Sequence, residues 1–292
     1  GRMPTQATLS QEELASQYGF ALSFMRQDKS LYALFQQAVK ENMTTAKFTA
    51  KLRETPWYKK NGESVRQYQL LQSTDPATLG ARRSQLLAQI QDLAGQMGAV
   101  IPAKSLTTIA ESALKLNWND SQLRNSLSGY VKAYNGVYTG AASTSVEQLR
   151  QTAWRNGVQM SSATLQSYAQ AIAAGKVNVD YYKNLIRKQA ASLAPGYAEE
   201  LNNGMDLFDI ANPFLQSKAR ILEMNPADID LFDPDIRAAL SGTTKDGKPA
   251  TTSIWQFEQS LRQKPEWLKT TNAQDQTMGV AHKVLLDMGL MG

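Results

Sequence analysis

The chain has 292 residues, of which 42% are hydrophobic and 20% charged, with a formal net charge of +5. This composition is sufficient for a buried core and excludes a largely disordered protein. The absence of cysteine excludes disulfides, thiolate metal sites and cysteine nucleophiles, and the single histidine excludes a zinc site built on several histidines. No apolar run reaches the ~18–20 residues that a membrane-spanning helix requires.

Hydrophobic spacing predicts helices along almost the whole chain, beginning at the N-terminus. Ser10 opens a capping box at the start of the first predicted helix. Ser30 is predicted to cap the second helix, and Thr44 or Thr45 the third. Pro56 is predicted to end that third helix, because proline disfavours helical backbone at the residue before it.

The middle of the chain continues the helical pattern. Asp75 is predicted to cap a long helix that ends at Gly98, since glycine commonly terminates helices. A further helix begins within residues 102–105. Asp120 or Ser121 is predicted to cap the helix that follows.

A block of about 59 residues is repeated in tandem within this region. A shift of 59 aligns Ala94 with Ala153 and Gly98 with Gly157, and Asn119 falls on Asn178. A repeat of this length is normally one supersecondary unit that packs on its neighbours. The sequence therefore predicts an all-α protein of packed helical hairpins with an internal tandem duplication.

Four modules follow from this pattern. They are an N-terminal helical module over 1–80, two repeats over 81–140 and 141–198, and a C-terminal helical module over 199–292. The last module contains an acidic segment, 199–240, and a loop or short hairpin near 243–252. The hairpin alternative rests on the turn dipeptide Asp246-Gly247.

The C-terminal module also repeats a pattern of the N-terminal one. The spacing of Phe257, Leu261, Arg262 and Pro265 matches that of Phe48, Leu52, Arg53 and Pro56, and a tryptophan follows each proline. Any amphipathic helical hairpin shares part of this spacing, so chance similarity remains an open alternative.

Charge is distributed unevenly along the chain. Residues 1–198 carry 22 Lys and Arg against 12 Asp and Glu, whereas residues 199–240 carry three against nine. The basic residues of 1–198 favour DNA or an acidic partner, but their scatter is more typical of solvated helix faces. The acidic segment is predicted to dock on the basic part of a neighbouring copy, which gives salt-sensitive self-association.

Glu111 is the single candidate catalytic residue. A Glu-Ser pair within a helix, here Glu111-Ser112, resembles that of lytic transglycosylases, in which the glutamate is the general acid. Those enzymes carry a Gly-Leu-Met-Gln element shortly downstream, and the nearest string here is 289–292, without the glutamine. The second repeat has Gln170 at the aligned position, so the sequence predicts no catalytic role for Glu111 and no enzyme.

Four aspartates alternate through a short segment and are the candidate metal ligands: Asp228, Asp230, Asp233 and Asp235. Calcium prefers several such oxygens, but the spacing is not that of an EF-hand loop. Helix starts explain the pattern better, because Asp233-Pro234 fits an N-cap followed by proline at the first helical position. We therefore expect neither a metal nor a cofactor.

The remaining chemistry-bearing side chains favour structural roles. His282 has no serine or carboxylate constellation, and a surface or packed position is expected for it. The tryptophans lie on or beside helical apolar faces and are predicted to anchor the core: Trp57, Trp118, Trp154, Trp255 and Trp267. Stacking on bases or sugars is the alternative for them.

Four short strings together resemble a known group of proteins. They lie at residues 18–24, 48–58, 229–234 and 246–249, and the last runs into Trp255. The combination is similar to large virion-associated proteins of tailed phages that infect actinobacteria. The resemblance covers most of the chain and implies a minor tail or internal structural role, but it brings no functional residues with it.

The sequence thus predicts a structural or interaction protein of a phage virion, made in the bacterial cytoplasm, with other virion proteins or further copies as partners. The alternatives are a piece of a peptidoglycan-cleaving enzyme and a DNA-binding virion protein. The start of the chain leaves two further alternatives open. Met3 is the initiator after residues left by cloning, or Gly1 follows cleavage of a longer precursor.

Overall fold

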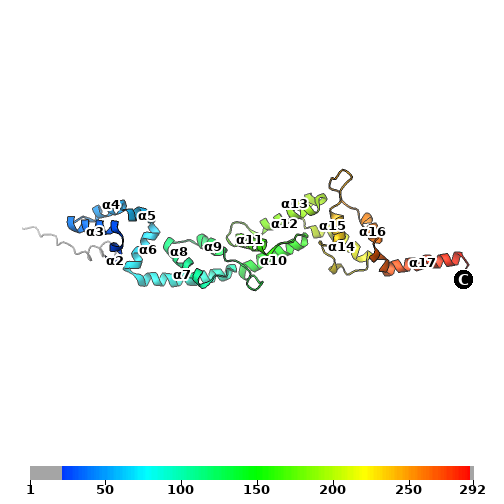
Figure 1. Cartoon of the computed structure of the whole chain (residues 1–292), viewed down its shortest axis with the longest axis horizontal. Coiled ribbons are helices and arrows are strands. Elements are labelled where there is room, and N and C mark those ends of the chain that lie inside the picture. Colours follow the sequence, from blue (N-terminus) through cyan, green and yellow to red (C-terminus); the bar gives the residue numbers. More distant parts are fainter. Residues whose placement is uncertain (1–21, 290–292) are drawn as a thin grey trace, which may run out of the picture. The chain divides into compact units, whose positions relative to one another are not determined.

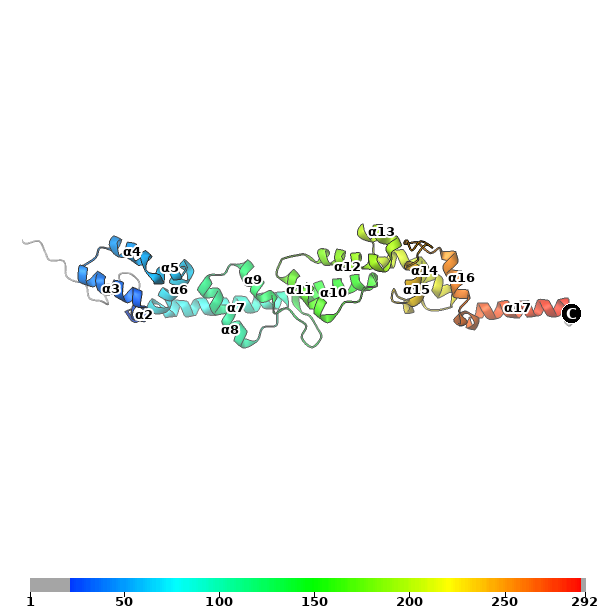
Figure 2. The ribbon, with the colours of Figure 1, turned by 45° about the horizontal axis from the view of Figure 1, so that its top comes forward.

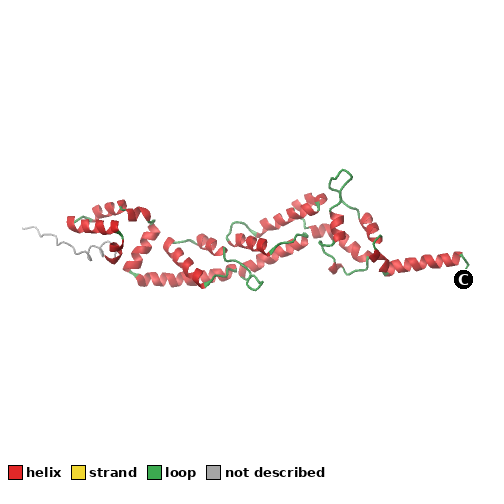
Figure 3. Cartoon of the chain, viewed as in Figure 1, coloured by secondary structure: helices red, strands yellow, loops and turns green. Residues whose placement is uncertain are grey.

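The computed structural model of the chain describes residues 22–289, which fall into two compact units. Unit 1 ends at Tyr134, and unit 2 begins at Asn135. The described residues form helices joined by loops, with no strand among them (Figures 1 and 3). The predicted all-α class is therefore confirmed, while the helix predicted at Ser10 lies outside the described residues.

The helices take up most of both units (Figure 1). Unit 1 contains α2 (Leu22–Gln27), α3 (Lys29–Glu41), α4 (Thr45–Glu54), α5 (Pro56–Lys60), α6 (Glu63–Thr74), α7 (Pro76–Met97), α8 (Ala103–Leu116) and α9 (Asp120–Ser128). Unit 2 contains α10 (Gly140–Arg155), α11 (Ser162–Ala173), α12 (Val179–Leu193), η1 (Pro195–Tyr197), α13 (Ala198–Asn202), α14 (Leu207–Ile221), η2 (Pro226–Asp228), α15 (Pro234–Leu240), α16 (Ile254–Arg262), η3 (Pro265–Lys269) and α17 (Thr271–Asp287).

Several helix ends lie where local sequence predicts them. Thr44 caps α4 and Asp75 caps α7, each through a side-chain oxygen that accepts a backbone N–H at 3.2 Å. Gly98 ends α7 in the left-handed region, with φ of 80°. Pro56 differs from the prediction in detail: it follows the end of α4 and occupies the first position of α5, where its missing N–H costs nothing.

Two predicted caps are wrong by one or two residues. Asp28, not Ser30, caps α3, because its carboxylate accepts from two backbone N–H groups, at 2.9 and 3.1 Å. Asn119, not Asp120 or Ser121, caps α9, in a reciprocal capping box with Gln122. In both places the actual cap, Asp28 or Asn119, has the extended backbone that a cap requires.

Unit 1 begins with a small apolar core. Met25, Leu31, Phe35, Phe48 and Trp57 are all buried in it. They come from α2, α3, α4 and α5, and Leu70 of α6 packs against the same cluster. Helix α6 then packs on both α7 and α8.

The starts of α8 and α11 lie 59 residues apart, and so do the starts of α9 and α12. Asn119 and Asn178 cap the latter pair in the same way, through side-chain oxygens that accept from the N3 amide. Gly98 and Gly157 both take positive φ after the preceding helix. The two segments share a helical layout, and the duplication itself stays a prediction, as do the four modules.

Unit 2 has its main core around α14. Buried apolar side chains from α12 to α16 form this core, among them Leu207, Phe214 and Leu215 of α14 itself, Ile236 of α15 and Phe257 of α16. The rings of Phe214 and Phe257 meet edge to face with centroids 5.2 Å apart. Pro213 lies inside α14 without ending it.

A buried amide joins three helices of unit 2. The Asn156 side chain is fully buried; its Oδ1 accepts from Leu207 N at 2.9 Å, and its Nδ2 donates to Asp206 Oδ1 at 2.9 Å. Asp206 also accepts from Arg155 Nε at 2.9 Å and from Arg187 Nε at 3.0 Å. The end of α10, the middle of α12 and the start of α14 are thereby held together.

The residue after this amide is restricted to glycine. Gly157 has φ of +64°, and a Cβ added there would lie 3.0 Å from the Leu231 Cβ. Its carbonyl oxygen accepts from the Arg237 guanidinium at 2.7 Å. The turn after α10 therefore requires both a left-handed backbone and close approach to another segment of unit 2.

The segment predicted as a loop or short hairpin forms one antiparallel bridge, between Thr243 and Pro249. Gly247, with φ of 76°, donates its N–H to Thr244 O at 2.9 Å and closes the turn. Short polar flanks explain why pairing stops at one bridge instead of extending into strands.

Replacement of Asn156 by alanine should destabilise unit 2 by about 3 kcal/mol, because it leaves the Leu207 N–H and the Asp206 carboxylate without their buried partner. Calorimetry should then show the unit 2 transition at a temperature lower by roughly 10 °C. Asn203→Ala, at an exposed position, is the control. Equal transitions for both variants would contradict the structural role of Asn156.

Stability of unit 2 should also depend on the charge of Asp206. Burial alone would raise the pKa of this carboxyl, but hydrogen bonds from Arg155, Asn156 and Arg187 hold the pKa below its ordinary value of 3.8. The stabilisation is therefore complete above that value and is lost as pH falls through the lower, folded-state pKa. Urea titrations should show the stability gap between wild type and Asp206→Asn shrinking below about pH 4 and constant above about pH 5.

Candidate functional site

Helix α17 presents an apolar stripe that is not covered by the other described residues of unit 2. Apart from Ala273 in its first turn, every residue of the helix is exposed, and Met278 is 71% exposed. Four exposed apolar side chains share one side of the helix, because they recur at helical spacing: Met278, Val284, Leu285 and Met288; the exposed Val280 and Leu286 lie outside this stripe. No other helix of unit 2 runs beside α17 in either view (Figures 1 and 2).

The first turn of α17 is firmly held. Glu223, which follows α14 with φ of 53°, accepts from Thr271 N at 2.9 Å and Asn272 N at 3.0 Å. These two backbone hydrogen bonds hold the pKa of Glu223 below its usual range. Thr270 is buried and caps the helix by accepting from Ala273 N at 3.1 Å. The helix dipole also stabilises a carboxylate at the N-terminus of a helix.

The helices before α17 repeat the layout found before α6. Helices α4 and α16 start 209 residues apart, and so do α5 and η3. Trp57 donates its indole N–H to Gln69 of α6 at 2.8 Å. Trp267 has no such partner: its indole nitrogen is buried and makes no hydrogen bond with the described residues.

The prediction that all five tryptophans anchor the core is only partly right. Trp57 is buried, and Trp118 and Trp267 are half-buried. Trp154 and Trp255 are exposed, Trp255 by 69%. Trp154 lies against Phe208, with ring centroids 5.3 Å apart. Both exposed tryptophans sit beside, not on, the buried stripe of their helix, which periodicity alone does not separate.

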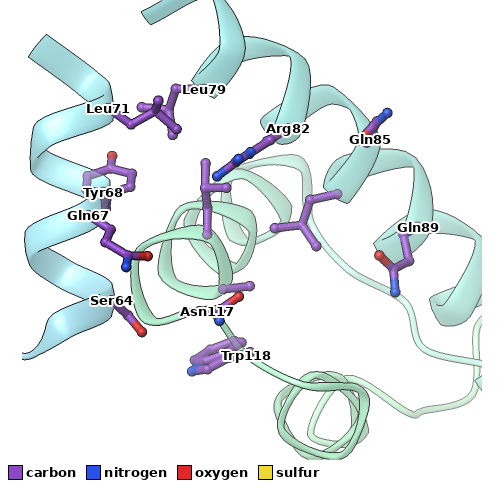
Figure 4. Close-up of a pocket in the computed structure, with 13 residues that line it drawn as sticks. Ser64, Gln67, Tyr68, Leu71, Leu79, Arg82, Gln85, Gln89, Asn117 and Trp118 are labelled. Atoms are coloured by element: carbon purple, nitrogen blue, oxygen red, sulfur yellow. The ribbon is translucent and has the colours of Figure 1, made fainter. Parts of the chain in front are cut away.

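A cavity of about 420 Å³ opens in unit 1 between α6, α7 and the end of α8 (Figure 4). Ser64 and Gln67 line it from α6, and Gln85 lines it from α7. Asn117 and Trp118 complete the wall after the end of α8. This site could not be predicted from the sequence, because its residues come from three helices and no motif connects them.

Glu111 lies next to this cavity but does not line it. Its carboxylate accepts from Tyr68 OH at 2.8 Å and pairs with the Arg83 guanidinium. The Arg83 hydrogen bond is the main reason that the pKa of Glu111 lies below its usual range. A glycosidic general acid needs a raised pKa, whereas the pKa of Glu111 is shifted in the opposite direction.

The aspartate segment is engaged in helix starts and lysine contacts. Asp233 caps α15 as predicted, and Lys218 Nζ lies 2.6 Å from Asp233 Oδ2 and 2.9 Å from Asp235 Oδ2. Asp235 also pairs with Lys264 Nζ at 2.6 Å, while Asp230 accepts from its neighbouring backbone. Within residues 22–289, no group of three or more Asp, Glu or His side chains could hold a metal ion.

Several charges predicted to face partners are used within their own unit. Asp206, Asp209, Asp233 and Asp235 of the acidic segment all pair with cations of unit 2. The segment therefore has fewer unpaired carboxylates available for docking on another copy than its sequence suggests. His282 lies exposed on α17, at a surface position.

Three arginines of residues 1–198 are likewise paired within their own unit. Arg83, Arg155 and Arg187 each pair with a carboxylate of their own unit. This reduces the positive charge that is free for a polyanion. Among the described residues, no helix combines the length and apolar character needed to cross a membrane.

Lys218→Met should destabilise unit 2 by about 3 kcal/mol, because two partly buried aspartates lose their shared cation. Burial alone would lower the pKa of Lys218, but Asp233 and Asp235 raise it, so the ammonium is charged at neutral pH. Thermal unfolding followed by circular dichroism measures the effect. Lys245→Met, at an exposed position, is the control, and an equal loss in both variants would contradict the prediction.

No family model, curated protein or solved structure matches the chain.

Proposed function

We propose that this chain is a structural protein of a phage virion, in the tail or the interior of the particle, and that it acts through helical protein–protein surfaces. The observation that carries the proposal is the uncovered apolar stripe of α17. The sequence resemblance to virion-associated phage proteins supports the setting, and the helical repeat pattern supports an architecture that builds surfaces.

Physical chemistry favours a partner for α17. A single helix of 17 residues is marginally stable in water unless an apolar face packs against something. Exposed apolar patches of this kind are typical of protein interaction sites. The anchored first turn fixes where the helix starts, so the stripe is offered from a defined position on unit 2.

Unit 1 supplies a template for the covered state. Its α6 follows α4 and α5 as α17 follows α16 and η3, and α6 packs on the helix pair α7 and α8. Helix α17 lacks an equivalent pair within the described residues. The unsatisfied indole N–H of Trp267, at the base of α17, is a second sign that this module is incomplete by itself.

The simplest partner is α17 of a second copy. In a two-fold pairing the stripe of one copy packs against the stripe of the other, so the same apolar surface is buried on both copies. Association of this kind is driven by apolar burial, and added salt should not weaken it. Docking through the acidic segment 199–240 would instead weaken as salt screens the charges.

The paired substitutions Met278→Glu and Leu285→Glu should abolish self-association, because they place two charges in the stripe. Light scattering across protein concentration and salt should show an oligomer for the wild type and a monomer for this variant. Circular dichroism should show that the other helices persist.

Gln276→Glu together with Lys283→Gln provides a matched control. These residues lie on the opposite side of α17, seven positions apart as in the test pair, and the net charge changes by the same amount. The control should associate like the wild type. A wild-type chain that is monomeric throughout, or a control that dissociates equally, would contradict the proposed role of the stripe.

A further inference from the structure

We propose that the cavity between α6, α7 and the end of α8 binds a short neutral oligosaccharide. The cavity volume of about 420 Å³ lies within the range of small-molecule sites. It is a feature of unit 1 alone and is independent of the stripe on α17.

The lining combines apolar side chains with side-chain amides. Leu86 and Leu114 contribute apolar surface, while Gln67, Gln85 and Asn117 contribute amides (Figure 4). Each amide offers both a donor and an acceptor, which is what neighbouring sugar hydroxyls require. A pyranose ring has an apolar face and a polar edge, and this lining offers both apolar and hydrogen-bonding groups.

Trp118 supplies an aromatic surface at the edge of the cavity. It is half-buried in the turn after α8, and its indole N–H makes no hydrogen bond with the described residues. The Trp57 indole, by contrast, is committed to Gln69. A large rigid ring with a free polar edge suits the C–H face of a sugar together with one hydroxyl.

Most of the side-chain amides that line the cavity make no short hydrogen bond within the described residues. Within residues 22–289, the side chains of Gln85 and Asn117 make no hydrogen bond. Those of Gln67 and Gln89 make only long contacts, 3.4 Å to Glu63 and 3.5 Å to Asp120. Arg82 is the one cation of the lining, so the chemistry favours a neutral ligand over a phosphate-rich one.

The cavity walls are braced against one another. Tyr68 of α6, Arg83 of α7 and Glu111 of α8 meet in one hydrogen-bonded group, so each wall contributes one member. The lowered pKa of Glu111 keeps that carboxylate charged at neutral pH, which preserves the group. The brace fixes the three helices before any ligand arrives, which lowers the ordering cost of binding.

The test is an NMR titration of the full chain with N,N′-diacetylchitobiose and with cellobiose, observing the indole N–H signals. The Trp118 signal, assigned by its loss in Trp118→Phe, should shift with a Kd on the order of 1 mM. Gln85→Ala should weaken binding at least about fivefold, since it removes an amide of the lining. Gln96→Ala, on α7 outside the cavity, should bind like the wild type.

Two results would overturn the proposal. One is an unshifted Trp118 signal at about 10 mM of both sugars. The other is an equal shift with a neutral tripeptide amide, which would indicate a non-selective cavity. The Met278→Glu, Leu285→Glu variant should bind sugar unchanged, so failure of the interaction role of α17 and failure of this site are separately visible.

Discussion

The fold of unit 2 depends on one buried side chain, the amide of Asn156. It sits at the end of α10, and it satisfies a backbone N–H at the start of α14 and the carboxylate that precedes that helix. Arg155 and Arg187 also pair with Asp206 and neutralise the charge of its carboxylate. The same contacts hold three helices together. Around this polar centre the apolar side chains of α14 form the core, and from the end of α14 Glu223 reaches the start of α17. The position of the exposed stripe therefore follows from a hydrogen-bonded junction inside the unit.

Unit 1 is organised differently, with an apolar core at its beginning and a polar brace further along. Tyr68, Arg83 and Glu111 join three helices through hydrogen bonds, and a cavity lies beside this group between the same helices. The same carboxylate that resembles a catalytic acid in the sequence is thus occupied by an arginine and a tyrosine. In the structure it joins α6, α7 and α8 and balances the charge of Arg83.

Local features were predictable because their causes lie within a few residues. The caps at Thr44, Asp75 and Asp233 and the stop at Gly98 follow from side-chain chemistry and backbone preference alone. Asn156 was not predictable as a junction, because its partner Asp206 is 50 residues away in the chain. The exposure of Trp255 was missed for a related reason: helical periodicity marks an apolar position, but only the neighbouring helices decide whether it is covered.

The anchored start of α17 would also affect how fast and how tightly the proposed partner is held. A helix stabilised only at its N-terminal turn frays from the other end, so binding along its stripe completes the helix while it forms the interface. Part of the interaction free energy is then spent on ordering the last turns, which favours complexes that assemble and separate readily. Changes that raise the intrinsic helicity of the far end, such as replacement of Gly279, would tighten the complex without adding a single contact.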